Sequence, residues 1–220
     1  APEERILLAA FNKSIAEELK SRITNPNAEA KTLHSVGFSI IRQTHTRCRV
    51  EKRSGDRAWE LARAGAQAPL QSSHAPGGAG KAEVPDGVLR KVSKLHSKAR
   101  EMHPYAETPG DLRAIAEQFE CEPDPFWVLQ GWDIDFVLHA AYTAMELAAE
   151  HYDTIDFADM IYLPLRNRWA APQYDLVVVD EAQDMNRAQL DLARAVLEPE
   201  GRMVLVGDDR QAIYGFRGAD

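Results

Sequence analysis

The sequence predicts an α/β fold in which a parallel β-sheet is interrupted by a helical segment. Short apolar runs at residues 6–11, 176–179 and 203–206 indicate strands, and four apolar residues without alternation at 176–179 indicate burial on both faces. Between the first run and the other two, strand-like runs disappear and helical periodicity takes over. Strands that alternate with helices at both ends of a chain are typical of a parallel sheet.

The elements near the amino terminus follow one another as strand, helix, strand and helix. Ile15, Leu19 and Ile23 recur every four positions after the first strand, and the Asn-Pro-Asn sequence at 25–27 ends this helix. Residues 28–41 contain the second strand and helix. Near the other end of the chain, Asn186 and Gln189 have the spacing of a capping box, which predicts the start of another helix.

The segment from about residue 44 to residue 150 is predicted to be a helical insertion within the α/β domain. Helices are expected at residues 88–102, 109–119 and 135–150. Residues 71–80, rich in Gly, Ser, Ala and Pro, have the composition of a loop. From residue 152 the α/β pattern resumes.

Charge is distributed unevenly along the 220 residues, whose net charge is −8. Residues 1–110 carry 18 Lys/Arg and 12 Asp/Glu, whereas residues 111–220 carry 8 and 22. Phosphate contacts are therefore expected from the first half, although its basic clusters are equally compatible with solvated helix faces. No apolar run is long enough to span a membrane, and Cys48 and Cys121 lack metal-type spacing. These features favour a cytoplasmic protein with reduced thiols.

Two adjacent carboxylates, Asp180 and Glu181, directly follow the apolar run at 176–179. Ligands of open α/β sheets bind at the carboxyl ends of the strands. Because Mg²⁺ in nucleotide sites takes one or two carboxylates together with phosphate oxygens, the pair predicts a metal–nucleotide site.

A second block makes this prediction more specific. The run at 203–206 opens onto Gly207-Asp-Asp-Arg-Gln-Ala-Ile-Tyr-Gly-Phe-Arg-Gly-Ala-Asp220. Together with Asp180-Glu-Ala-Gln-Asp184, this block resembles motifs II and III of the UvrD/PcrA/Rep-like superfamily 1 DNA helicases. The two motifs are long and in the correct order, and the resemblance extends over nearly all of the α/β part of the chain.

The resemblance implies a RecA-like, P-loop NTPase type of sheet with an all-helical insertion subdomain. Residues 1–44 would form the first part of the RecA-like domain, residues 45–151 the insertion, and residues 152–220 the second part with Walker B and motif III. Thr32-Leu-His-Ser35 and Ile155-Asp-Phe-Ala-Asp-Met160 resemble the motifs that border the insertion in this family.

The resemblance also implies ATP and Mg²⁺ as cofactors. Asp180 would ligate Mg²⁺, and Glu181 would activate or orient the water that attacks the γ-phosphate. Gln211 resembles the motif III glutamine that senses this phosphate, and Arg217 would contact a phosphate or link the nucleotide and DNA sites.

Single-stranded DNA and single/double-strand junctions are the implied partners, and no membrane is expected. Tyr214 and Phe216 resemble an aromatic pair on which bases stack, although a core role is the alternative for either ring. Arg217 also belongs to the expected DNA contacts, together with residues near the first two strands. These are Phe11, Asn12, Lys13, Thr32, His34 and Ser35; for Phe11, interior packing is an equal alternative.

Two parts of the family pattern are expected outside residues 1–220. The Walker A loop would precede strand 6–11, and Gly77–Lys81 is no substitute, because Ala75 and Ala82 occupy its required Gly and Ser/Thr positions. A second RecA-like domain would follow Asp220. Residues 1–220 alone are therefore expected to hydrolyse negligible ATP.

Three readings of the whole protein remain. The first is an ATP-dependent helicase with 3′ to 5′ polarity, implied by the resemblance, that acts in repair, replication or recombination. The second is a non-catalytic DNA- or partner-binding module derived from such a motor, which the joint presence of Asp180, Glu181 and Gln211 disfavours. The third is the motor part of a helicase–nuclease.

Overall fold

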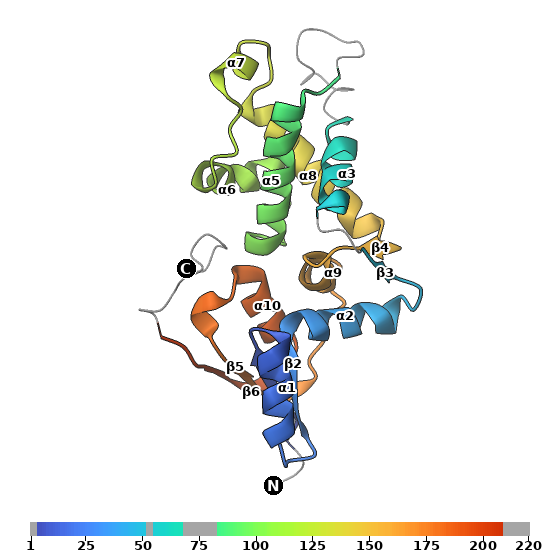
Figure 1. Ribbon diagram of the computed structural model, residues 1–220, viewed down its shortest axis with the longest axis vertical. Coiled ribbons are helices and arrows are strands. Elements are labelled where there is room, and N and C mark those ends of the chain that lie inside the picture. The colour runs from blue at the N-terminus through green and yellow to red at the C-terminus, as the bar shows by residue number, and fades with distance from the viewer. Residues whose placement is uncertain (1–3, 52–54, 68–82, 209–220) are drawn as a thin grey trace. The chain divides into compact units, whose positions relative to one another are not determined.

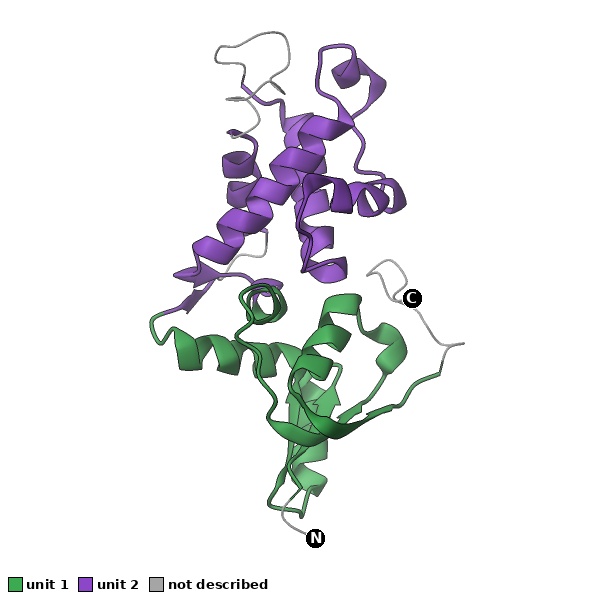
Figure 2. Cartoon of the chain, turned by 180° about the vertical axis from the view of Figure 1, so that it is seen from behind, with its two compact units in different colours: residues 1–47, 160–220 green, residues 48–159 purple. Residues whose placement is uncertain are grey.

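The computed structural model describes residues 4–51, 55–67 and 83–208 (Figure 1). Two compact units make up the chain: residues 1–47 with 160–220, and residues 48–159 (Figure 2). The first unit is α/β. Its elements are β1 (Ile6–Ala10), α1 (Lys13–Arg22), β2 (Ala28–Thr32), α2 (Leu33–Thr44), β5 (Tyr174–Val179), the short 3-10 helix η2 (Ala182–Asp184), α10 (Arg187–Ala195) and β6 (Leu197–Leu205).

The sheet of the first unit has four parallel strands in the order β2-β1-β5-β6, which confirms the predicted fold class. Backbone pairing aligns Ala10 with Thr32 and Ala9 with Val179. Because parallel strands point the same way, the carboxyl ends of β1, β2 and β5 meet at one edge of the sheet.

One face of this sheet carries the main core of the unit. Leu7 and Ala9 of β1 alternate with half-buried neighbours, as do Val177 and Val179 of β5. The buried side chains pack against apolar residues of α2, α10 and the segment 161–165. These partners include Leu33, Val36, Ile40, Ile161, Leu165, Leu192 and Val196.

The prediction that residues 176–179 are buried on both faces is wrong for the described part of the chain. Leu176 and Val178 are only half-buried, and among the described residues Leu19 of α1 is the helical side chain that lines the hollow beside Leu8 and Val178. The apolar run 203–206 is a strand as expected, but Val204 is 45% exposed because β6 is an edge strand in the described sheet.

The second unit is mainly helical. One very short strand lies near its beginning and another near its end, and the two pair with each other. Its elements are β3 (Arg49–Val50), α3 (Asp56–Gly65), α5 (Asp86–Met102), η1 (Pro109–Leu112), α6 (Arg113–Gln118), α7 (Pro125–Val128), α8 (Ile134–Glu150) and β4 (Thr154–Ile155). Helix α9 (Asp159–Arg166) starts at Asp159, the last residue of this unit. The parallel β3–β4 pair was not predicted: β3 lies within residues 45–151, which were expected to be all-helical. No described helix is long and apolar enough to cross a membrane.

A buried network of charges joins α3 and α5 to the segment that follows β4. Asp159, fully buried, accepts from Arg57 Nε at 2.6 Å and from Arg100 Nη1 at 2.7 Å. Arg100 also donates two hydrogen bonds to Asp156, at 3.0 and 2.9 Å. The two carboxylates in turn accept each other's backbone N–H, so Asp156 and Asp159 form a closed turn. Burial raises the pKa of the Asp156 carboxyl, but the charge and hydrogen bonds of Arg100, the backbone N–H of Asp159 and the charge of Arg57 together hold that pKa below its usual value.

His96 lies one helical turn before Arg100 and is fully buried. Neither ring nitrogen has a hydrogen-bond partner in the described residues. Burial lowers the pKa of His96, and the positive charges of Arg100 and Arg57 lower it further. The imidazole is therefore neutral in the folded protein at neutral pH.

Removing Asp159 should destabilise the helical unit strongly. Asp159→Ala leaves Arg57 and Arg100 without their shared carboxylate, and breaking a buried pair costs about 3–5 kcal/mol. Asp135→Ala, which removes the exposed ion pair with Arg113, should cost less than about 1 kcal/mol. Urea unfolding followed by tryptophan fluorescence measures both, and equal losses would contradict a buried network.

The neutral state of His96 predicts a specific acid sensitivity. Its folded pKa lies below the unfolded value of about 6.5, so below that pH the unfolded chain takes up a proton that the folded chain refuses. The free energy of unfolding should therefore decrease as the pH is lowered below that value, by up to about 1.4 kcal/mol per pH unit for this residue. His96→Leu should lose that part of the slope between pH 6.5 and 5, whereas His151→Leu, an exposed control, should keep it. Identical slopes in wild type and His96→Leu would contradict the assignment.

Candidate functional site

The carboxyl edge of the sheet brings together segments that are distant in sequence. Residues 11–13 follow β1, residues 33–35 follow β2, and the carboxylate pair follows β5. Since β1 lies between β2 and β5, the Asp180–Glu181 pair lies next to residues 11–13, and residues 11–13 lie next to residues 33–35. This edge holds all the predicted site residues within the described part of the chain.

Asp180 is fixed by the backbone at the end of β5. Its N–H donates to the carbonyl of Ala9 on β1 at 3.0 Å. Its Oδ1 accepts the N–H of Glu181 at 3.1 Å. The other carboxylate oxygen has no hydrogen-bond partner among the described residues, and the side chain is half-buried. A fixed, partly exposed carboxylate with an open oxygen fits a Mg²⁺ ligand.

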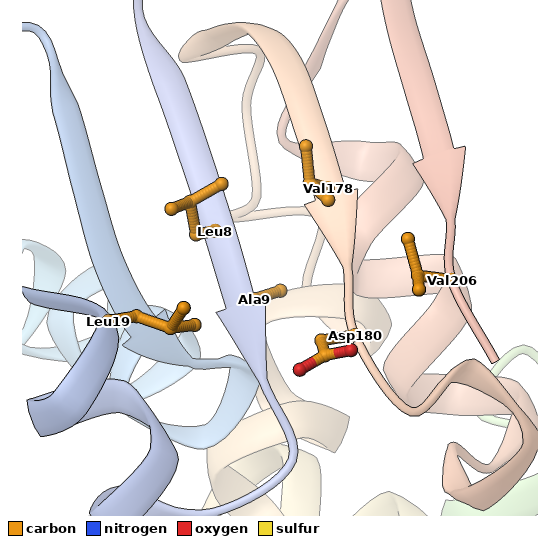
Figure 3. Close-up of a pocket in the computed structure, with 6 residues that line it drawn as sticks. All are labelled: Leu8, Ala9, Leu19, Val178, Asp180 and Val206. Atoms are coloured by element: carbon orange, nitrogen blue, oxygen red, sulfur yellow. The ribbon is translucent and has the colours of Figure 1, made fainter. Parts of the chain in front are cut away.

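A hollow of about 230 Å³ adjoins Asp180 on the less covered face of the sheet (Figure 3). Apolar side chains line it, and Asp180 contributes the only charged group of its lining among the described residues. The apolar lining consists of Leu8, Ala9, Leu19, Val178 and Val206. These residues supply no donor for a nucleotide phosphate, so phosphate contacts would have to come from other groups.

Glu181 occupies a strained backbone conformation. Its φ and ψ of 51° and 45° lie in the left-handed region, which costs a residue with a Cβ about 1–2 kcal/mol. The turn lets Gln183 Nε2 donate to Glu181 Oε2 at 2.6 Å. Oε1 has no partner among the described residues. Strain of this kind persists where surrounding contacts hold it, and it is concentrated at functional sites.

Contacts with the end of β6 hold this turn. The N–H of Ala182 donates to the carbonyl of Val206 at 2.9 Å, and the N–H of Asp208 donates to Gln183 Oε1 at 3.2 Å. Gln183 was not among the predicted site residues. It lies within the Asp180–Asp184 motif that carries the resemblance, but its second partner belongs to another loop, and this contact could not be predicted from the sequence.

Two of the predicted DNA contacts also cap helices. Asn12 Oδ1 accepts the N–H of Ile15 at 3.0 Å and starts α1, and Thr32 Oγ1 accepts the N–H of Ser35 at 3.1 Å and starts α2. The Thr32 and Ser35 hydroxyls lie 2.9 Å apart. These side chains therefore have a structural role that is independent of any DNA contact.

The remaining predicted contacts differ in exposure. Lys13 is largely exposed, with a 3.6 Å ion pair to Glu17 on the surface of α1. His34 is half-buried on the first turn of α2. Phe11 packs against the core while remaining half-buried, as the interior alternative expected. Gln211, Tyr214, Phe216 and Arg217 lie outside the described residues.

Comparison with known families identifies the fold type. The model of the UvrD/REP helicase N-terminal domain matches residues 1–220. The chain belongs to this family. The match confirms the resemblance inferred from the motifs around Asp180 and Gly207, and it agrees with a parallel sheet of RecA-like type.

Individual relatives support the same assignment. Over 98% of its length the chain is 25% identical to the ATP-dependent DNA helicase PcrA of Bacillus subtilis, of which it covers 28%. It is 37% identical to the ATP-dependent DNA helicase Rep of Escherichia coli over 30% of the chain and 11% of that protein. DNA helicase II of Salmonella typhimurium is 33% identical over 40% of the chain and 14% of its own length. The chain thus spans under a third of these relatives.

Proposed function

We propose that residues 1–220 are part of the motor of an ATP-dependent DNA helicase. The observation that carries the proposal is the carboxylate pair at the end of the central strand β5, beside the loops that follow β1 and β6. Membership of the UvrD/REP family agrees with it, and the relatives carry the corresponding activity in their names.

In the proposed site, Asp180 holds Mg²⁺ through its open oxygen and Glu181 receives a proton from, or orients, the attacking water. Bound Mg²⁺ would neutralise charge on the β- and γ-phosphates. The left-handed turn at Glu181 and the hydrogen bond from Gln183 restrict the position of the Glu181 carboxylate. Gln211 and Arg217 complete the proposed nucleotide contacts.

The proposed DNA path uses groups of two kinds. Lys13, Asn12 and the Thr32–Ser35 segment provide positive charge or hydrogen-bond donors for phosphates, while Tyr214 and Phe216 provide faces for base stacking. Neither kind requires a particular base sequence, which suits a motor that moves along single strands. Phe11 and Arg217 are further proposed contacts.

The whole protein is proposed to contain more than the segment 1–220. A Walker A loop and a second RecA-like domain would complete the ATP site, and the proposed boundaries of the parts present are 1–44, 45–151 and 152–220. Translocation from 3′ to 5′, unwinding at single/double-strand junctions and a role in repair, replication or recombination belong to the same proposal. ATP hydrolysis by residues 1–220 alone is expected to be negligible.

Removing the proposed base tests the enzymatic part. Glu181→Gln keeps the side chain's size but not its basicity, and loss of a positioned base lowers kcat about 10²–10⁴-fold. Single-strand-stimulated phosphate release by the full-length protein measures this effect. Glu117→Gln, an exposed carboxylate on α6, is the control and should match wild type. A rate of hydrolysis by Glu181→Gln within 3-fold of wild type, a change in activation free energy on the order of 0.6 kcal/mol, would contradict the role of Glu181 as base.

Removing both proposed stacking rings tests the DNA part. Tyr214→Ala with Phe216→Ala should weaken oligonucleotide binding by the full-length protein by about 10-fold or more, since one stacked base contributes about 1–3 kcal/mol. Phe126→Ala removes a different aromatic ring, 62% exposed in the helical unit, and should leave affinity unchanged. Fluorescence anisotropy with a labelled single strand distinguishes the two, and unchanged affinity in the double variant rejects the stacking role.

A further inference from the structure

Gln183 makes two different hydrogen bonds with the two ends of its amide. Nε2 donates to the Glu181 carboxylate at 2.6 Å, and Oε1 accepts the backbone N–H of Asp208 at 3.2 Å. A carboxylate can only accept and a backbone N–H can only donate, so the amide has one orientation that satisfies both partners. The side chain therefore joins the loop after β5 to the loop after β6.

The backbone around this amide is shaped to admit it. A Cβ on Gly207 would lie 2.2 Å from Gln183 Oε1, a distance that no real contact reaches. The next neighbours of that Cβ, the backbone nitrogens of Ala182 and Gln183, would be 3.2 and 3.3 Å away. Glycine at position 207 thus leaves room for one particular side chain.

The chemistry of the contact explains what it does for Glu181. A hydrogen bond from Gln183 to Oε2 fixes one carboxylate oxygen of Glu181. The other oxygen, Oε1, remains without a partner among the described residues. A carboxylate with one oxygen fixed and one open has the arrangement that activation of a water molecule requires.

We infer that Gln183 is a positioning residue that holds Glu181 as the base for ATP hydrolysis and anchors it to the backbone at Gly207–Asp208. This inference rests on the proposed function, because the role of Glu181 as base belongs to that proposal. Gln183 acts through Glu181 and through the β6 loop, and it need not touch the nucleotide itself.

Two substitutions at position 183 separate the possible roles. Gln183→Leu keeps approximate volume but loses both hydrogen bonds, and should lower kcat about 10- to 100-fold with KM for ATP within about 3-fold, since small misplacements of catalytic groups have effects of this size. Gln183→Glu keeps the acceptor for Asp208 but loses the N–H donor to Glu181. It should likewise lower kcat with KM for ATP within about 3-fold, because the catalytic carboxylate loses its anchor.

A double-variant cycle tests the contact with Gly207. Gly207→Ala should lower kcat about 10-fold or more in the wild-type background, because the new methyl group displaces the amide. In the Gln183→Ala background, where the 2.2 Å clash is absent, the same substitution should cost less than about 3-fold. If the two effects simply multiply, Gly207 acts through the backbone and the inference is overturned.

The measurements use the full-length protein, with Glu181→Gln in parallel. Wild-type kcat in the Gln183 variants, beside an inactive Glu181→Gln, would overturn this inference and leave the proposed function standing. Full hydrolysis by Glu181→Gln would overturn both. Thermal unfolding checks that each variant folds; if Gln183→Leu does not, the kcat of Gln183→Glu decides.

Discussion

The parallel pairing of β1 with β5 is the constraint on which the candidate site depends. The paired register ends at Ala9 and Val179, and the N–H of Asp180, the first of the two carboxylate residues, donates to the carbonyl of Ala9. The position of Asp180 is therefore set by the sheet. The same pairing places the segment after β1, with Asn12 and Lys13, beside the carboxylate pair.

A second layer of contacts extends this order beyond the strand ends. Glu181 adopts a left-handed backbone conformation, and this turn persists because Ala182 and Gln183 both form hydrogen bonds with the loop after β6. The strain at one residue is thus balanced by hydrogen bonds that only the folded sheet can supply. In the helical unit, Asp156 and Asp159 are organised in a similar way, with two arginines from separate helices satisfying a buried turn.

The sequence was most informative where the determining interactions are local. The capping box of Asn186 and Gln189 is present, with reciprocal bonds of 2.8 and 2.9 Å at the start of α10. Helices predicted at 88–102 and 135–150 span 86–102 and 134–150, since their apolar stripes are continuous. The strand at 176–179 was predicted from its apolar run for the same reason. The carboxylates that directly follow it belong to the pattern that carried the family resemblance.

Interactions between distant segments were not predictable from one sequence. Arg57 and Asp159 are 102 positions apart, and nothing in the local sequence pairs them. The β3–β4 pair involves two residues on each side, too few to produce a periodic pattern. Burial of β5 on both faces was predicted from four apolar residues without alternation, but exposure depends on which helices cover each face. Gln183 was missed because its role arises from two loops that meet only in the folded chain.

The proposed function requires that the end of β5 binds a metal–nucleotide complex through Asp180. Electron paramagnetic resonance of Mn²⁺, used in place of Mg²⁺ with a non-hydrolysable ATP analogue, tests it in the full-length protein. Asp180→Asn should weaken Mn²⁺ binding at least about 10-fold, while Asp175→Asn, at the opposite end of the same strand, should bind as wild type does. Equal Mn²⁺ affinity in wild type and Asp180→Asn would contradict the account.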